Sequence, residues 1–234
     1  MQALILAAGQ GRRLGSNIPK PLIEIGGQPL LIRLISQLQK LDIRDIGVVL
    51  GYQRETIRKT VENMDIRFVY NEIYDASDNM YSFWIAREEL HEDCIISHTD
   101  LILEDDLLRR IVQVEGDVIL PMDTRTLDQE SMKIRLADDR IARIGKEIPL
   151  DEADGESIPC IKFSAAGLEA LKQQVETIIG TGDHRQFLES AIQRLIGNRS
   201  LDIAVLDITG SRWAEIDTPA DLESARKLFK TSRP

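Results

Sequence analysis

The chain has 234 residues, of which 43% are hydrophobic, and a formal net charge of −10 at neutral pH. This length can bury the core of one domain, and the acidic balance argues against a general nucleic-acid binder, which needs a basic face. The apolar N-terminal run is too short to cross a membrane and has no charged leader or cleavage signal, so we expect a cytoplasmic protein without a membrane partner.

Strands and helices alternate through the first half of the chain. The hydrophobic pattern predicts strands at residues 3–8, 46–50, 66–70, 94–97 and 118–121, and helices at 29–41, 54–62, 79–90 and 107–114. Such alternation is typical of βαβ units. It predicts an α/β fold, a single domain with a mainly parallel, doubly wound central sheet flanked by helices.

The second half has a different pattern. Residues 132–136 and 141–144 flank Asp138-Asp139, which predicts a small β-hairpin lobe. Strands are also expected at 158–163, 203–206 and 212–216, and helices at 164–175, 186–196 and 219–229, the first of them capped by Ser164.

A loop rich in glycine and basic residues follows the first strand, with Gly9–Arg13 and then Pro19-Lys20-Pro21. Ligands of open α/β sheets bind beyond the carboxyl ends of the strands, where this loop lies. Glycines allow backbone N–H groups to approach a phosphate, and Arg13 and Lys20 add charge-assisted hydrogen bonds. The loop lacks the Gly-Lys-Ser/Thr of a Walker motif, and Leu14 stands where a dinucleotide fingerprint needs a third glycine.

Acidic residues follow two other predicted strands. Asp100 comes after the fourth strand, on the same sheet edge as the loop, where a carboxylate can bind Mg²⁺. The alternative is a helix N-cap, for which Glu104–Asp106 is better placed. In an extended 212–217, Trp213, Glu215 and Asp217 point to one side; the alternative there is a Thr-Pro helix start with solvated acids.

The glycine-rich loop resembles the signature loop of nucleotidyltransferases that make nucleotide sugars and related activated alcohols. The resemblance implies nucleotide binding by the backbone of its early residues and by two basic side chains. The matching positions are Leu6, Ala7, Ala8, Gly9, Gly11, Arg13, Lys20 and Pro21. It also implies that Asp100 and Asp217 bind Mg²⁺, with Asp100 at the nucleotide phosphates.

A second segment is similar to small bacterial phosphocholine cytidylyltransferases and their relatives. The matching residues are Asn71, Tyr74, Asn79 and Ser82, whereas Asp78 and Phe83 depart from that pattern. The resemblance implies CTP as the nucleotide, with Asn79 and Ser82 near the base. The alternative is an Asp/Asn cap on an amphipathic helix.

The acceptor is expected to bind in the second half of the chain. Aromatic and acidic side chains suggest a pocket for a quaternary ammonium through cation–π attraction, the candidates being Trp213, Trp84, Tyr74, Tyr81, Asp75 and Glu215. The hairpin also resembles that of inositol-phosphate cytidylyltransferases, and Lys146 or Lys133 on it can hold an acceptor phosphate. The alternatives are packing in the core for the aromatics and solvation for the lysines, and His98 is interpreted as structural.

Together these patterns predict a Mg²⁺-dependent cytidylyltransferase. It transfers CMP from CTP to a small phosphorylated alcohol, phosphocholine or a similar phospho- or phosphono-compound, and releases pyrophosphate. The predicted catalytic residues are Arg13, Lys20, Asp100 and Asp217, and the predicted acceptor residues are Lys146, Trp213 and Glu215. Residues 1–122 form the nucleotide-binding half, and residues 123–234 form the acceptor-binding half with the second metal ligand.

Three other functions remain alternatives. The first is a sugar-1-phosphate nucleotidyltransferase using UTP, dTTP or GTP, and the second is a non-catalytic nucleotide-sensing domain. A glycosyltransferase is the third, although His98-Thr99-Asp100 lacks the first aspartate of an Asp-x-Asp motif. The identity of the acceptor and the choice between monomer and homodimer stay open.

Overall fold

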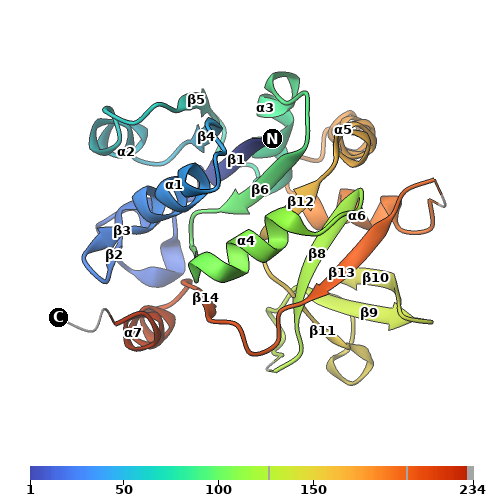
Figure 1. Cartoon of the computed structure of the whole chain (residues 1–234). Helices are drawn as coiled ribbons and strands as arrows, with labels where there is room; N and C mark the ends of the chain where they lie inside the picture. The colour runs from blue at the N-terminus through green and yellow to red at the C-terminus, as the bar shows by residue number, and fades with distance from the viewer. Residues whose placement is uncertain (126, 199, 231–234) are drawn as a thin grey trace.

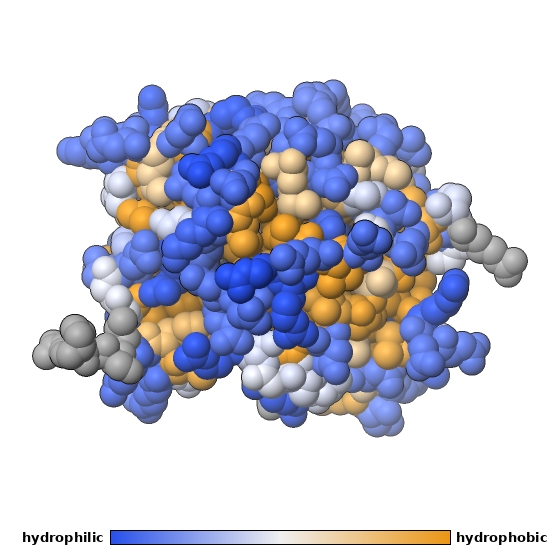
Figure 2. Space-filling view, viewed as in Figure 1, coloured by the Kyte–Doolittle hydropathy of each residue, from blue (hydrophilic) through white to orange (hydrophobic). Residues whose placement is uncertain are grey.

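The architecture is that of a computed structural model, which describes residues 1–125, 127–198 and 200–230. On the face shown in Figure 2, hydrophilic side chains predominate and hydrophobic ones form smaller patches between them. Within the described residues, no helix has the length and apolar character needed to cross a membrane.

A ten-stranded sheet forms the centre of the fold (Figure 1). Its path order is β10 (Arg140–Gly145), β9 (Lys133–Ala137), β11 (Gly155–Ser157), β8 (Val118–Asp123), β12 (Cys160–Phe163), β6 (Cys94–His98), β1 (Gln2–Ala7), β4 (Asp45–Leu50) and β5 (Arg67–Tyr70), while β13 (Ile203–Asp207) pairs with β8. Strands β5, β4, β1 and β6 run parallel, and β12 is antiparallel to β6 and β8. The predicted α/β class with a mainly parallel central sheet is confirmed.

Strand β1 has parallel neighbours on both sides. Leu6 pairs with Val49 of β4 on one side and with His98 of β6 on the other. The chain therefore leaves β1 toward one side of the sheet and later returns on the other side. Ligands of doubly wound folds bind at such a switch point. The loop after β1 lies there.

Helices cover both faces of the sheet (Figure 1). Helices α1 (Leu30–Lys40), α2 (Arg54–Thr60) and α4 (Asp105–Gln113) pack on one face, and α3 (Asn79–Ala86), α5 (Ala165–Ile179) and α6 (Leu188–Leu195) pack on the other. Helix α7 is Pro219–Leu228, and 3₁₀ turns lie at Arg12–Leu14, Lys20–Leu22, Arg87–Glu89 and Leu150–Glu152.

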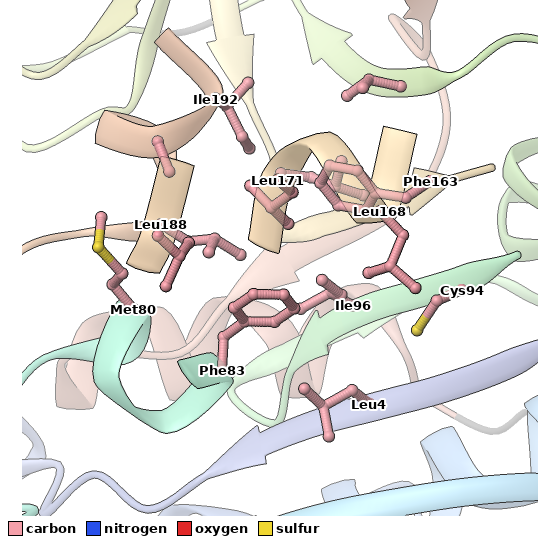
Figure 3. Close-up of a cluster of buried hydrophobic side chains, with 14 of the residues drawn as sticks. Leu4, Met80, Phe83, Cys94, Ile96, Phe163, Leu168, Leu171, Leu188 and Ile192 are labelled. Atoms are coloured by element: carbon pink, nitrogen blue, oxygen red, sulfur yellow. The ribbon is translucent and has the colours of Figure 1, made fainter. Parts of the chain in front are cut away.

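The alternation of side chains along β1 joins two hydrophobic cores. Leu4 and Leu6 belong to the cluster under α3, α5 and α6, whereas Ala3 and Ile5 belong to the cluster under α1, α2 and α4. Figure 3 shows the first cluster, in which Phe83 of α3 lies beneath side chains of α5 and α6. Because β1 is buried on both faces, the loop that follows it starts from a rigid base.

The predicted hairpin is present. Asp138 and Asp139 connect antiparallel β9 and β10 with φ angles of 50° and 59°, as a two-residue hairpin turn requires. The hairpin continues the edge of the main sheet through β11, a strand that the sequence pattern does not predict. The predicted N-cap is also confirmed, because the Ser164 hydroxyl accepts a hydrogen bond from the Gly167 N–H at 3.1 Å.

Two small sheets support the switch point. One pairs β2 (Glu24–Ile25) with β3 (Gln28–Pro29), and the other pairs β7 (Leu101–Leu103) with β14 (Trp213–Glu215). A third hydrophobic cluster joins them, with members from the first loop, β2, β7, the residue after β14, and α7: Leu14, Ile23, Ile25, Leu30, Ile102, Ile216 and Ala225. This cluster fixes the C-terminal segment beside the loop after β1.

Candidate active site

A cavity of about 970 Å³ opens at the switch point. Its wall includes the loop after β1, residues 71–82, the end of β6, the hairpin edge, the start of α6, and residues 213–217. Nearly all predicted site residues from both halves of the chain therefore meet around one space, which is large enough for a nucleotide and a small second substrate.

Glycines shape the loop after β1. Gly11 has a φ of +60°, and a Cβ atom on it would lie 2.7 Å from Cγ of Lys20. A side chain at position 11 would therefore strain the backbone and displace Lys20. Around Gly9, no heavy atom would lie within 4 Å of an added Cβ, which leaves room for a ligand to approach the backbone.

Lys20 lies between two carboxylates that are far apart in sequence. Its Nζ is 3.0 Å from Oδ2 of Asp100 and also pairs with Oδ1 of Asp217. The Lys20 side chain is 11% exposed and those of Asp100 and Asp217 are 19% and 25% exposed. Arg13 donates to Asp217 at 2.6 Å from the solvent side. The four predicted catalytic residues therefore form one ion-pair network.

The network changes the protonation of its members. Burial opposes the charge on Lys20, but Asp100 and Asp217 outweigh it and raise the lysine pKa above its ordinary value. Burial also opposes ionisation of Asp100, yet the charges of Lys20 and His98 keep its pKa below the ordinary value. The site thus holds a fixed positive charge beside at least one ionised carboxylate.

Pairing between β7 and β14 brings Asp217 to Asp100. Glu215 lies opposite Leu101, and the Ile216 N–H donates to the Asp100 carbonyl at 2.9 Å. Thr218 then caps α7 in a reciprocal capping box with Asp221. The strand and the cap fix Asp217 between them. The predicted Thr-Pro helix start is confirmed, whereas the role of Asp217 as a metal ligand stays a prediction.

His98, Asp100 and Glu215 form a second group on the inner side of Lys20. One ligand atom from each lies within 4.8 Å of the others. Among the described residues, Asp100 Oδ1 is buried and has no hydrogen-bond partner, a state that suits an oxygen that binds a cation. These residues fit a divalent metal ion. His98 lines the cavity, and its Nε2 is 3.1 Å from Nδ2 of Asn79, so its interpretation as a structural residue stays a prediction.

Glu215 has a strongly raised pKa. Burial, followed by the charges of Asp100 and Asp217, raises its pKa from 4.5 to about 8. Its predicted role in acceptor binding stays a prediction. Its position within 4.8 Å of ligand atoms of His98 and Asp100 also allows it to contact a metal ion.

We expect Glu215→Gln to stabilise the metal-free protein in alkaline solution. The unfolded state ionises near pH 4.5 and the folded state near pH 8, so wild-type stability falls as the pH rises between these values. Glutamine does not titrate. In EDTA the variant should therefore match the wild-type Tm near pH 4.5 and exceed it near pH 8.5. The expected rise is roughly 2–4 °C for each kcal/mol gained in the free energy of unfolding. A Tm difference that does not change with pH would contradict this explanation.

The segment from Asn71 to Ser82 forms the wall next to the loop. Asn71 is buried and donates from Nδ2 to the Ser82 hydroxyl at 3.0 Å. Asn79 accepts at Oδ1 from the Leu188 N–H at 2.7 Å. Asp78 is the N-cap residue of α3 but makes no capping hydrogen bond with its side chain. Asn79 and Ser82 both line the cavity, and their contact with a nucleotide remains a prediction.

The aromatic pocket predicted from sequence is only partly formed. Trp213 and Tyr74 line the cavity, and Trp213 Nε1 donates to Asp123 at 2.6 Å. Trp84 instead donates to Glu176 on α5 at 2.9 Å and packs against Tyr81, and neither of these two rings lines the cavity. The helical phase of α3 turns Trp84 toward α5, and the Tyr81 ring packs against His184. That part of the prediction is wrong.

The two hairpin lysines differ in position. Lys133 is fully buried and donates to the carbonyls of Asp128, Gln129 and Ser131, so it holds a turn together and does not project toward a substrate. Lys146 lines the cavity, 3.4 Å from Glu130 and above the Phe187 ring. Of the two, Lys146 remains the candidate for binding an acceptor phosphate.

Known proteins are similar to this chain in sequence and in fold. Residues 3–190 match the model of the MobA-like NTP transferase domain. The chain belongs to this family. The predicted nucleotidyltransferase is therefore confirmed at the family level.

Relatives of this MobA-like NTP transferase include cytidylyltransferases. The choline-phosphate cytidylyltransferase of Streptococcus pneumoniae is 25% identical over 98% of this chain and 99% of its own length. The bifunctional IPC transferase and DIPP synthase of Aquifex aeolicus is 28% identical over 98% of this chain, which spans about half (52%) of that protein. The inositol-1-phosphate CTP transferase of T. maritima superposes with a TM-score of 0.81 at 21% identity, covering 97% of this chain and 94% of that one.

The cavity wall also includes residues that were not predicted, and Glu156, Ser157 and Glu189 are three of them. Glu189 lies among the buried residues of α6, which include Leu188 and Ile192. A charged residue within an apolar helix face is a signal that sequence inspection can find. Glu156 and Ser157 lie on the short strand β11, which has too few residues for a periodic pattern.

Proposed function

We propose that the chain is a Mg²⁺-dependent cytidylyltransferase that transfers CMP from CTP to a small phosphorylated alcohol or phosphonate and releases pyrophosphate. The observation that carries this proposal is the ion-pair network at the switch point, in which Lys20 lies between Asp100 and Asp217 beside an open glycine loop. A cation flanked by carboxylates at a phosphate-binding loop is suited to a triphosphate with its metal ion.

The reaction needs no protein nucleophile. An acceptor phosphate oxygen bonds to the α-phosphorus of CTP, the bond from that phosphorus to the β-phosphate oxygen breaks, and pyrophosphate leaves with the electron pair. With a dianionic acceptor the charges balance and no proton moves. Catalysis of this kind depends on positioning and on stabilising spread negative charge.

Each network residue has a role in that scheme. Lys20 and Arg13 neutralise the phosphates, and backbone N–H groups near Gly9 approach them. Asp100 and Asp217, with Glu215 beside Asp100, would hold Mg²⁺. The ion supplies Lewis-acid polarisation of the α-phosphate when bound. Lys146 is the candidate partner of the acceptor phosphate because it lines the cavity on the hairpin side.

Two observations support CTP as the nucleotide. The residues that match the small cytidylyltransferases, Asn71, Asn79 and Ser82, line the cavity beside the loop. The S. pneumoniae relative is named a choline-phosphate cytidylyltransferase, and its alignment covers 98% of this chain.

A pyrophosphate-release screen tests the proposal. CTP, UTP, GTP and dTTP are each combined with Mg²⁺ and phosphocholine, phosphoethanolamine, aminoethylphosphonate, inositol phosphate or a hexose 1-phosphate. We expect release with CTP and a phospho-alcohol or phosphonate, and at least tenfold less with the other nucleotides. Turnover of a hexose 1-phosphate with UTP or dTTP would replace the proposal by the sugar-nucleotide alternative, and nucleotide binding without any turnover would favour a sensing domain.

A further inference from the structure

The acceptor side of the cavity contains two carboxylates that form no ion pair with a described residue. Glu156 and Glu189 both line the cavity; Glu156 is half-buried, and Glu189 is 7% exposed. In the described part of the chain, neither residue takes part in a salt bridge, although 22 such pairs are present. A carboxylate as buried as that of Glu189 is normally paired.

Two polar atoms in the lining of this cavity also lack hydrogen bonds. Among the described residues, Oε2 of Glu189 and Oγ of Ser157 are buried and have no partner, and Ser157 is 5% exposed and lines the same cavity. More than nine in ten buried polar groups are hydrogen-bonded. Two unpartnered oxygen atoms in the lining of one cavity suit a ligand that brings hydrogen-bond donors.

The other acids of this wall are already satisfied. Asp123 binds Arg125 and the Trp213 indole. Asp128 accepts hydrogen bonds from residues of its own turn. Glu130 pairs with Arg13 and Lys146 at the rim. These three acids therefore have partners that Glu189 lacks among the described residues, while Glu156 has the Ser131 hydroxyl but no ion pair there.

We propose that Glu156, Ser157 and Glu189 form a subsite for a primary ammonium group on the phosphorylated or phosphonate acceptor. This inference rests on the proposed function, because the phosphate of the same molecule has to lie near Lys20 and the CTP. An –NH₃⁺ group carries three N–H donors and one positive charge. It supplies both the missing charge and the missing hydrogen bonds.

A quaternary ammonium fits this wall less well. Its methyl groups cover the charge, and it has no N–H to offer Oε2 of Glu189 or Oγ of Ser157. Such ligands are bound by cages of aromatic faces, and of the four aromatic side chains predicted for this purpose only Trp213 and Tyr74 line the cavity, while Trp84 and Tyr81 lie outside it. A site built to bind N–H groups rejects an analogue that lacks them, because its polar atoms then stay unpaired.

The charge state of Glu156 agrees with this assignment. Burial, with the nearby charges of Asp128 and Asp123, raises its pKa from 4.5 to about 6. An ammonium group at this place would favour the ionised carboxylate. The bound ammonium group would therefore stabilise the ionised Glu156 carboxylate, which burial and nearby acids destabilise in the free protein.

Three acceptors that differ only at the amine end test the subsite: phosphoethanolamine, phosphocholine and ethyl phosphate. We measure kcat/KM with CTP, and binding by calorimetry, for the wild type, Glu189→Gln and Ser157→Ala. Glu169→Gln is the matched control, because this glutamate is 63% exposed on α5, outside the cavity. The KM for CTP and the Tm serve as checks on the nucleotide site and the fold.

The wild type should prefer phosphoethanolamine over both analogues by at least tenfold in kcat/KM. Glu189→Gln should remove most of that preference and Ser157→Ala part of it, with an unchanged KM for CTP. Equal use of the three acceptors, or a Glu189→Gln defect of the same size for all three, would overturn the subsite. Selective binding of phosphoethanolamine without any CMP transfer would support the subsite and refute the proposed function, whereas equal or absent binding would refute the subsite itself.

Discussion

Replacing Lys20 by methionine is expected to lower kcat/KM for nucleotidyl transfer by about 10²–10³-fold, the usual effect of removing one charge-stabilising donor. The Lys20 side chain is 11% exposed and contacts both Asp100 and Asp217. Methionine keeps its length but removes its charge. A steady-state assay of pyrophosphate release measures the loss.

The same variant should respond differently to metal. Without the ammonium group, the negative charges of Asp100 and Asp217 repel each other, so the Tm in EDTA should fall. Adding Mg²⁺ replaces the lost charge, and the rise in Tm should exceed that of the wild type. Lys40→Met is the control, since Lys40 is 66% exposed in a surface pair with Asp105. Wild-type turnover in Lys20→Met would refute a role for this lysine in catalysis.

Asp100→Asn should reduce turnover by roughly 10²–10⁴-fold, because the several kcal/mol that a metal ion contributes to the transition state depend on its ligands. The amide has nearly the shape of the carboxylate, so the fold should be preserved. The Mg²⁺ concentration for half-maximal activity should rise in parallel. A magnesium titration of the pyrophosphate-release rate tests both effects.

Asp106→Asn is the matched control for Asp100→Asn. Asp106 belongs to α4, is 69% exposed and pairs with Arg109 on the surface. Its variant should keep the wild-type rate and the wild-type magnesium midpoint. If Asp100→Asn behaved in the same way as this control, Asp100 would not be a metal ligand.

Local patterns were sufficient wherever neighbours in sequence decide the structure. The buried run ending at Ala7 and the glycines that follow it predict a strand and a ligand loop at its end. Asp138-Asp139 predicts a hairpin turn, and the structure has positive φ angles at both residues. Thr218-Pro219 predicts the start of α7, where Thr218 is the N-cap.

Contacts between segments that are distant in the sequence were harder to predict from sequence patterns. Trp84 and Tyr81 have the composition of an aromatic cage, but the phase of α3 directs Trp84 to α5 and Tyr81 to His184. His98 has no motif of its own and enters the site only because β6 ends beside β1. A residue type shows what a side chain can do, whereas its direction depends on the packing of the element that holds it.

The sequence by itself determined the class of fold, the phosphate-binding loop and the identity of Lys20, Asp100 and Asp217 as candidates. Only the tertiary structure joined them, because the pairing of β7 with β14 brings together residues separated by more than 100 positions. The tertiary structure also shows that buried side-chain oxygen atoms of Glu189 and Ser157 have no hydrogen-bond partner among the described residues. Hydrogen-bond satisfaction is a property of three-dimensional neighbours, and no periodicity along the chain encodes it.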